Sequence, residues 1–476
     1  MPPHQTHRKY TEFAADRRPR TAVFGQIRRP FGLKYMTVMT AKICIIGSGP
    51  AGLFTAIKLV RHGVDDIVMF EKNSVSFGGL MNDCKLNFDH RIGMDIEELQ
   101  LTESEVYQHL AEIKEVFKNS GYCTKVTDPN APEIKKWIDR FAVHDMELVV
   151  AEQFHCGSDN AKHLIRYLIG FLEDKVELRK RTGIEEIEFD GEKFTLKDSY
   201  GDEHFCDILV VTPGRSGAYW FREQARKLGI KFRFGEIDVG LRVELNAKVL
   251  DPLTSKIYDP KVKYLTKKYR DKVRTFCVNP HGRVRLEHYD GFKLVNGDAL
   301  MKHKTPNTNF AILQTIKLTE PLADTTRYGR FIAYSVNLLG DNTPIAQRLG
   351  DLKRGRRSKK SNFYDSTRYD CMPTLKLITV GDISLSYPKR IMDNLLEFME
   401  QLDKVLPGIM SDSTILYAPE IKFYDTRYLT DKNLKVEGFE NLFIGGDGVG
   451  KSRGIVGASL NGLMIAEGIL KLLGKN

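Results

Sequence analysis

The sequence predicts an α/β protein: a Rossmann-like dinucleotide-binding unit interrupted by a β-rich α+β insertion. Three observations predict this fold class. Residues 41–72 contain a complete βαβ pattern, residues 207–217 an apolar strand with a glycine turn, and residues 441–470 a glycine-rich strand, turn and helix. Between the last two, short apolar segments alternate with polar ones, which is typical of strands.

The βαβ unit reads "AKICIIGSGPAGLFTAIKLVRHGVDDIVMFEK". An apolar strand leads into G-x-G-x-x-G, an amphipathic helix follows, and a second strand ends at Glu71. Gly47 permits the tight turn, Gly49 lets the backbone approach a pyrophosphate, and Gly52 lets the helix pack on the strand. The helix N-terminus offers amide donors, and Glu71 can accept from a ribose hydroxyl. A purely structural glycine turn would leave Glu71 unexplained, so the unit predicts dinucleotide binding.

Three segments resemble the FAD-binding domains of glutathione-reductase-like flavoproteins: "GSGPAG" with a terminal "EK", "DILVVTPGRSG" and "NLFIGGDGVG". The resemblance implies FAD, with Asp447 bonding the ribityl chain and the helix from Gly454 pointing at the flavin ring. It also implies that the adenine lies near Ile184. The residues expected to contact FAD are Gly47, Ser48, Gly49, Pro50, Ala51, Gly52, Glu71, Lys72, Gly79, Leu80, Asn82, Ile184, Thr212, Gly214, Gly446, Asp447, Gly454 and Ile455.

Further ordered blocks are similar to a family of predicted FAD-dependent dehydrogenases. They include "FGGLMNDCKLNF" (77–88), "HCGSD" (155–159), "DVGLRVE" (238–244) and "GDGVGKSRGIVGAS" (446–459). The resemblance implies hydride transfer between a small-molecule substrate and flavin N5, and it supplies no substrate. Cys84 stands where the family pattern has Gly. It is either a packing residue or a thiol that touches the isoalloxazine.

The stretch "GGDGVGKS" (445–452) also fits the P-loop of nucleotide hydrolases. A P-loop enzyme needs a downstream strand that ends in an Asp for Mg²⁺. The chain after Ser452 is long enough for one helix only, which disfavours an ATPase. Lys451 remains a candidate ligand for the flavin or for a substrate anion.

Four side chains are candidates for the reaction itself. His155 could exchange a proton near flavin N5, or cap the following helix. Lys85 could stabilise the anionic reduced flavin, or form a salt bridge with a phosphate or carboxylate. Arg242 and Lys451 could bind a substrate anion. The chain has no second complete G-x-G-x-x-G unit, so we expect no separate NAD(P)H domain, and nicotinamide is left as a transient reactant.

The FAD domain is expected to be discontinuous. Its first part is assigned to residues 41–217, the inserted substrate domain to 218–375, and its C-terminal part to 376–476. Thr102 and Glu105 predict a capping box at the start of a helix. "MELVVAEQFH" (146–155) reads as one strand, and the helix at 387–408 is expected to return toward the FAD domain.

The distribution of charge limits the partners that the chain is expected to bind. The net charge is +10; residues 1–40 carry +6 of it, which disfavours nucleic-acid binding by the rest of the chain. The cluster "KRGRRSKK" (353–360) reads as a solvated loop, with RNA docking by a non-redox flavoprotein as the alternative. Residues 1–40 are a disordered arm, a translated upstream stretch or an organelle transit peptide.

The seven cysteines show no metal-ligand spacing, so we expect no metal site, and their scatter is consistent with a reducing, cytoplasmic location. No uninterrupted run of 18 apolar residues occurs, so the sequence predicts no membrane-spanning segment.

Overall fold

The computed structural model describes residues 41–74, 77–81, 83–289, 291–318, 323–423 and 426–475. The chain divides into two units, Met1–Met39 and Thr40–Asn476, and the second is described here. The expectations for the N-terminal arm and for Asn82 lie outside the described residues.

A five-stranded parallel sheet carries the dinucleotide-binding unit, with strand order β23-β11-β1-β2-β7. Its strands are β1 (Ile43–Ile46), β2 (Ile67–Glu71), β7 (Val176–Lys180), β11 (Ile208–Val211) and β23 (Leu442–Ile444). Every residue of β1, β11 and β23 is buried. Their continuously apolar sequences follow, because both faces of a parallel sheet are covered. The predicted Rossmann-like fold is confirmed.

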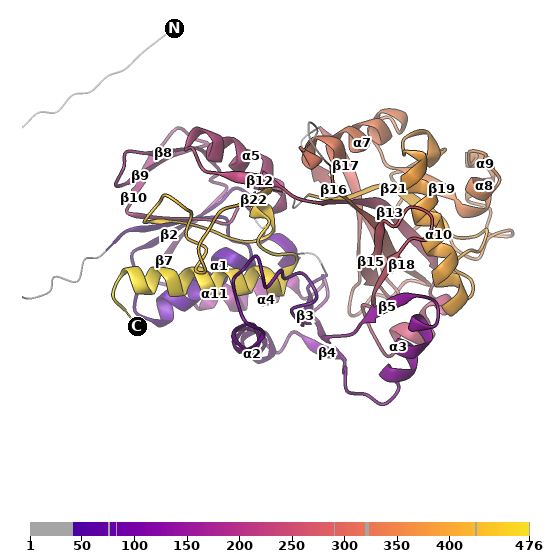
Figure 1. Ribbon diagram of the computed structural model, residues 1–476, viewed down its shortest axis with the longest axis horizontal. Coiled ribbons are helices and arrows are strands. Elements are labelled where there is room, and N and C mark those ends of the chain that lie inside the picture. Colours follow the sequence, from indigo (N-terminus) through magenta and orange to yellow (C-terminus); the bar gives the residue numbers. More distant parts are fainter. Residues whose placement is uncertain are drawn as a thin grey trace, which may run out of the picture. The chain divides into compact units, whose positions relative to one another are not determined.

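Different layers cover the two faces of this sheet. One core contains residues of α1 (Pro50–Arg61), α2 (Glu103–Asn119), α4 (Ala161–Gly170) and α11 (Ile455–Leu472). The other contains residues of α5 (Gly214–Lys227) and of the antiparallel sheet β8 (Ile184–Phe189), β9 (Phe194–Asp198) and β10 (Glu203–Cys206). Helices α1 and α11 lie side by side (Figure 1). The two backbones approach so closely at Gly462 that a side chain would not fit there. A Cβ on Gly462 would lie 2.3 Å from the carbonyl oxygen of Ala51.

By length and composition α11 could cross a membrane, with a mean hydropathy of 1.4. In the sequence, Glu467 and Lys471 interrupt the apolar run, so no stretch of 18 apolar residues marks this helix. Of the helix, 83% is buried inside the structure. Its apolar character is therefore explained by packing in the core.

The inserted lobe is built on an eight-stranded sheet of order β20-β19-β21-β13-β18-β15-β14-β5. The strands are β5 (Met146–Val149), β13 (Ile237–Asn246), β14 (Lys261–Leu265), β15 (Lys272–Asn279), β18 (Asn307–Ile316), β19 (Ile345–Arg348), β20 (Thr379–Val380) and β21 (Ile415–Lys422). Helices α7 (Thr325–Leu339) and α10 (Lys389–Val405) share its core, as does α3 (Ile134–Ala142).

This core changes the expected domain boundaries. It draws on residues 134–150 and 237–423 rather than on 218–375. Helix α10 was expected to return to the FAD domain, but its apolar face packs against β18 and β15. The strand expected at 146–155 is also two strands, because β5 joins the lobe whereas β6 (Glu152–His155) pairs with β3 (Lys85–Phe88) and β4 (Thr124–Thr127).

The predicted capping box at the start of α2 is confirmed. The Thr102 side chain accepts from the Glu105 amide, and the Glu105 carboxylate accepts from the Thr102 amide. The remaining elements are β12 (Phe232–Phe234), β16 (Arg283–Tyr289), β17 (Phe292–Asp298), β22 (Thr426–Tyr428), α6 (Asp251–Thr254), α8 (Leu349–Lys353), α9 (Lys360–Phe363), η1 (Gly78–Met81), η2 (Ala247–Val249), η3 (Ile383–Leu385) and η4 (Asp447–Val449).

Two of the cysteines form a disulfide. Cys123 and Cys156 are joined, with Cα atoms 4.1 Å apart and a sequence separation of 33. The expectation of a wholly reduced set of scattered cysteines is therefore wrong for this pair. The two residues are brought together because β4 and β6 are neighbours in one small sheet, and spacing alone did not reveal that.

Candidate functional site

The predicted cofactor residues gather at the carboxyl edge of the parallel sheet, where ligands of open α/β sheets bind. Gly47, Gly214 and Gly446 follow β1, β11 and β23, and all three have positive φ. A Cβ on Gly47 would lie 2.2 Å from the carbonyl oxygen of Thr212, so only glycine fits between these two strands. Thr212 closes the contact by donating from Oγ1 to the carbonyl oxygen of Gly47 at 2.9 Å.

Three glycines from different segments leave the same edge of the sheet accessible. Gly49, Gly214 and Gly454 have no heavy atom within 4 Å of the position that a Cβ would take. Gly49 directly precedes α1, whose first residue is Pro50, and Gly454 directly precedes α11. Two helix N-termini, each with free amide donors and the positive end of a dipole, therefore face space that a phosphate-bearing ligand could enter.

Glu71 lies at the end of β2 and is 7% exposed. Its Oε2 accepts from Ser48 Oγ at 2.6 Å and from the Ser48 amide at 3.3 Å. Its Oε1 accepts from the Asn73 amide at 2.9 Å. The carboxylate thus ties the glycine turn to the second strand, and its further acceptor capacity is directed to the place that the fingerprint assigns to a ribose.

Asp447 caps the last helix. Its carboxylate accepts from the Gly454 amide at 3.0 Å and from Ser452 Oγ at 2.9 Å. Burial raises the pKa of Asp447, and the hydrogen bond from Gly454 acts in the opposite direction. Asp447 therefore also holds the N-terminus of α11 at the carboxyl edge of the sheet.

The other residues expected to contact the cofactor differ in how accessible they are to a ligand. Gly79 lies against Ile455, with 3.2 Å between its Cβ position and Ile455 Cγ1. Lys72 is exposed, and Ile184 opens β8 after the turn that follows β7. Leu80 is fully buried in the core, so only its backbone could reach a ligand.

The P-loop reading and the substrate role of Lys451 are both contradicted. Lys451 Nζ bonds Glu98 at 3.0 Å, and the lysine side chain is 2% exposed. Burial lowers the pKa of Lys451, and Glu98 counteracts that effect. The loop also makes a 3₁₀ turn at 447–449 and begins its helix only at Ile455, so it forms no phosphate cradle around the lysine.

The structure joins the two predicted catalytic residues through a third residue. His155 Nε2 lies 2.6 Å from Asp83 Oδ1, and Lys85 Nζ lies 2.8 Å from Asp83 Oδ2. Lys85 also donates to the Asn279 side chain at 2.5 Å and to the carbonyl oxygen of Val278. His155 is 1% exposed, and its Nδ1 has no hydrogen-bond partner among the described residues. His155 ends β6 and does not cap α4, which excludes the alternative interpretation of this residue.

The charges in this cluster are fixed by mutual contact. Burial alone would raise the pKa of Asp83, but Lys85 and His155 lower it to about 2. Burial opposes the charge on Lys85, but Asp83 raises its pKa above the ordinary value. A permanent ion pair therefore lies next to the imidazole. The neighbouring Cys84 is fully buried in the core, which supports the packing interpretation, and burial raises the pKa of its thiol.

Arg242 does not reach a substrate. Its side chain is fully buried and pairs with Glu420, with Nε donating at 2.7 Å. Its remaining donors bond the Cys277 carbonyl oxygen, Asn309 and Asn296. Arg242 is thus an internal tie between strands of the lobe, and the prediction of a substrate-binding role is wrong.

The basic cluster at 353–360 is partly neutralised within the lobe. Lys353 and Arg354 pair with Asp412, and Arg356 pairs with Asp351. These contacts support the solvated-loop interpretation. Among the residues that the structure describes, no group of three or more His, Cys, Asp or Glu side chains could hold a metal ion.

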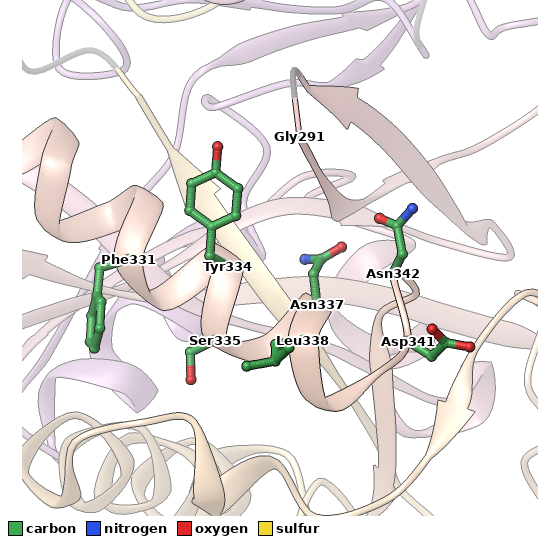
Figure 2. Close-up of a pocket in the computed structure, with 8 residues that line it drawn as sticks. All are labelled: Gly291, Phe331, Tyr334, Ser335, Asn337, Leu338, Asp341 and Asn342. Atoms are coloured by element: carbon green, nitrogen blue, oxygen red, sulfur yellow. The ribbon is translucent and has the colours of Figure 1, made fainter.

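Two hollows are lined by residues of the lobe. One, of about 620 Å³, is a surface groove along α7 and the turn that follows it (Figure 2). The side-chain amide of Asn337 in this groove is already hydrogen-bonded within the protein. Its Oδ1 accepts from the Lys293 amide and its Nδ2 donates to the Lys293 carbonyl oxygen, both at 2.9 Å. The other, of about 270 Å³, lies between α5, η4 and the lobe, and Gly448 lines it. The second hollow is therefore the better candidate for a reactant, because it adjoins the carboxyl edge of the parallel sheet.

Sequence reasoning missed the charged residues of this second hollow. Arg215 directly follows Gly214 and pairs with Glu287 at 3.0 Å. Its position in the glycine turn "TPGRSG" could have indicated from the sequence that it lies near the cofactor edge. No such signal marked Arg222 and Arg330, because these residues are 108 positions apart in the sequence and their helices meet only in the folded chain.

Comparisons with known proteins agree with this architecture. A family model described as an NAD(P)-binding Rossmann-like domain matches residues 45–108. An uncharacterized protein of Clostridium beijerinckii is 22% identical over 486 residues, which cover 94% of this chain and 84% of that protein.

Solved structures with similarity over most of the chain are more distant. They include 2,6-dihydroxypyridine-3-hydroxylase from Arthrobacter nicotinovorans (TM-score 0.42, 11% identity, 92% of this chain and 85% of that one) and glycine oxidase from Geobacillus kaustophilus (0.42, 12%, 90% and 95%). L-proline dehydrogenase from P. horikoshii has a TM-score of 0.41 at 12% identity, covering 92% of this chain and 94% of that one. At this distance the similarities carry no argument about activity.

Proposed function

We propose that this protein is an FAD-dependent oxidoreductase acting on a small molecule. The observation that carries the proposal is the glycine-lined edge of the parallel sheet, where Gly49, Gly214 and Gly454 leave space beside two helix N-termini. Glu71 ends β2 at the same edge, where the dinucleotide fingerprint has the acid that binds a ribose. The three sequence segments that resemble flavoproteins are those that meet here, which favours FAD over a nicotinamide dinucleotide.

The residues at this edge fit the parts of FAD. Amides at the start of α1 would bind the pyrophosphate, Glu71 the adenosine ribose, and Asp447 a ribityl hydroxyl. The N-terminus of α11 would place a positive dipole end near the ring. Bound FAD would supply a two-electron redox centre that exchanges a hydride at N5.

The chain itself would handle the proton. The Asp83 carboxylate accepts from His155 Nε2, which leaves Nδ1 as the site that takes up or releases a proton. Lys85 keeps Asp83 ionised, so the carboxylate continues to orient the imidazole in either protonation state. We therefore assign His155 as the proton-transfer residue, and Asp83 and Lys85 as residues that position it.

The direct test is the cofactor content of the purified full-length chain. The protein should be yellow and should release FAD on heat denaturation. Anaerobic addition of NAD(P)H or a metabolite should then bleach the flavin if it is redox-active. A colourless protein that cannot be reconstituted with FAD, but binds NAD, would refute the proposal, and a flavin that no reductant bleaches would indicate a non-redox role.

A further inference from the structure

The hollow of about 270 Å³ is shared by both parts of the molecule. Helix α5 contributes Tyr219 and Arg222, α7 contributes Arg330, and Gly448 comes from the turn beside Asp447. Its volume is close to the lower end of the roughly 300–1,000 Å³ of small-molecule sites. It can hold a single-ring or bicyclic ligand, but it is too small for an entire dinucleotide.

Guanidinium groups are the charged part of the lining. Three guanidinium groups line the hollow, from Arg215, Arg222 and Arg330, and none of the described lining residues is acidic. Glu287 already pairs with Arg215 at 3.0 Å. Asp324 pairs with Arg222 at 3.3 Å. The lining therefore offers guanidinium donors to a ligand that carries acceptor atoms.

Arg222 has a specific requirement for an acceptor. Its side chain is 4% exposed, and its Nη1 donates to Thr326 Oγ1 at 3.1 Å and forms an ion pair with Asp324 at 3.3 Å. Its Nε is buried and has no hydrogen-bond partner among the described residues. A buried donor without a partner is costly, and a ligand carboxylate would satisfy it.

Aromatic rings provide flat walls next to this donor. The guanidinium of Arg222 lies 5.0 Å from the ring centroid of Tyr219, and that of Arg330 lies 5.2 Å from the centroids of both Tyr219 and Phe292. Phe292 in turn stacks on Tyr289, with 5.4 Å between centroids and 5° between planes. Planar faces and stacked guanidinium groups favour a planar aromatic ligand over a flexible aliphatic one.

We propose that this hollow binds a planar aromatic carboxylate, with Arg222 pairing the carboxylate and Tyr219 packing against the ring. Its place beside Gly448 makes that ligand the substrate of the flavin, and this part of the inference rests on the proposed function. The binding site itself stands on the lining residues alone.

The test uses the full-length protein with its cofactor, titrated calorimetrically with benzoate and with the neutral isostere benzamide. Benzoate should bind saturably and roughly tenfold or more tightly than benzamide, since only benzoate offers a charged acceptor. Arg222→Gln should weaken benzoate roughly tenfold and leave benzamide unchanged. Tyr219→Leu, at a half-exposed position that tolerates change, should weaken both ligands.

Arg226→Gln is the matched control, because Arg226 lies one turn further along α5 and pairs at the surface with Glu223. It should leave both affinities unchanged. Equal binding of the two ligands, no binding of benzoate at millimolar concentration, or loss of FAD from Arg222→Gln without a change in benzoate affinity would overturn the inference. If the protein holds no FAD at all, the proposed function fails, whereas the same calorimetric titrations still decide whether the hollow binds aromatic carboxylates.

Discussion

The Glu71 carboxylate joins the glycine turn to the end of β2 through its bonds to Ser48 and Asn73. We expect Glu71→Ala to weaken FAD binding by about 1–3 kcal/mol, roughly fivefold to 150-fold, because it removes the ribose acceptor and leaves buried donors unpaired. The FAD dissociation constant is the measurement. Glu177→Ala, at an exposed position of the neighbouring β7, is the control, and unchanged retention in Glu71→Ala would mean that the ribose is held elsewhere.

Asp447 and Lys451 are four residues apart but have separate roles in the structure. Asp447→Ala should damage FAD retention, by about 1.5–3 kcal/mol, because it removes a charged acceptor from the cofactor edge and from the cap of α11. Lys451→Ala should instead lower the free energy of unfolding, since Glu98 loses a buried partner, and should leave FAD bound. Dissociation constants and denaturant titrations of both variants test this. Tight ATP binding that is lost only in Lys451→Ala would revive the P-loop interpretation.

Asp83 makes stability depend on pH. Its pKa is about 2 in the folded protein against an ordinary 3.8. The depressed pKa gives a stabilisation that is present above about pH 4 and is lost as the pH falls toward 2, worth about 2 kcal/mol. Asp83→Asn should therefore lose less stability than the parent between about pH 5 and about pH 3. Urea titrations across this range measure the difference, with exposed Asp139→Asn as control; parallel curves for the parent and Asp83→Asn would contradict the assignment.

At the scale of elements, the contact between α1 and α11 depends on Gly462. A Cβ at this position would lie 2.3 Å from the Ala51 carbonyl oxygen and 2.9 Å from Phe54 Cβ. Gly462→Ala should therefore force the helices apart and cost about 1–3 kcal/mol in the free energy of unfolding. Gly170→Ala, in a helix with no heavy atom within 4 Å of the Cβ position, should be neutral or slightly stabilising. Equal effects of the two changes would show that the helix contact is looser than the structure has it.

How much could be predicted from sequence differs between elements for a physical reason. The βαβ unit and the capping box of α2 are local, so spacing alone predicts them. The division between β5 and β6 depends on partner strands elsewhere in the chain, and alternation within one apolar run does not reveal it. The same holds for α10, whose amphipathic pattern gives a buried face but not the sheet that it covers.

In the candidate site, too, local spacing predicts the residues that lie close together in the sequence but not the contacts between distant ones. Glycines and Glu71 could be found because the fingerprint fixes their spacing. Arg242 looked like a substrate ligand until the structure paired it with Glu420, 178 residues away. The role of Asp83 in joining the two candidate catalytic residues could not be read from the sequence, because Asp83 and His155 are 72 positions apart.

For the whole molecule, the described helices and strands run from β1 at Ile43 to α11 ending at Leu472, and the parallel sheet and the eight-stranded sheet are the two largest sheets among them. The cores on the two faces of the parallel sheet and the core of the lobe are all drawn from within that span. Residues 1–40 add a charge of +6 and prolines at 2, 3, 19 and 30, without an apolar period that would dock on a core. We therefore expect the part of the chain that follows to fold without residues 1–40.

A chain truncated to start at Met39 should accordingly fold and bind FAD as the full-length chain does. β1 begins four residues later, and its partners β2 and β11 both lie further along the chain, so no strand pairing is lost. Removing the arm should shift the isoelectric point downward and leave the thermal midpoint and the FAD content per chain unchanged. Thermal unfolding and the flavin absorbance of matched preparations measure both quantities. Aggregation of the truncated chain, or a lower FAD content, would show that the arm contributes to the fold and that the boundary near residue 40 is wrong.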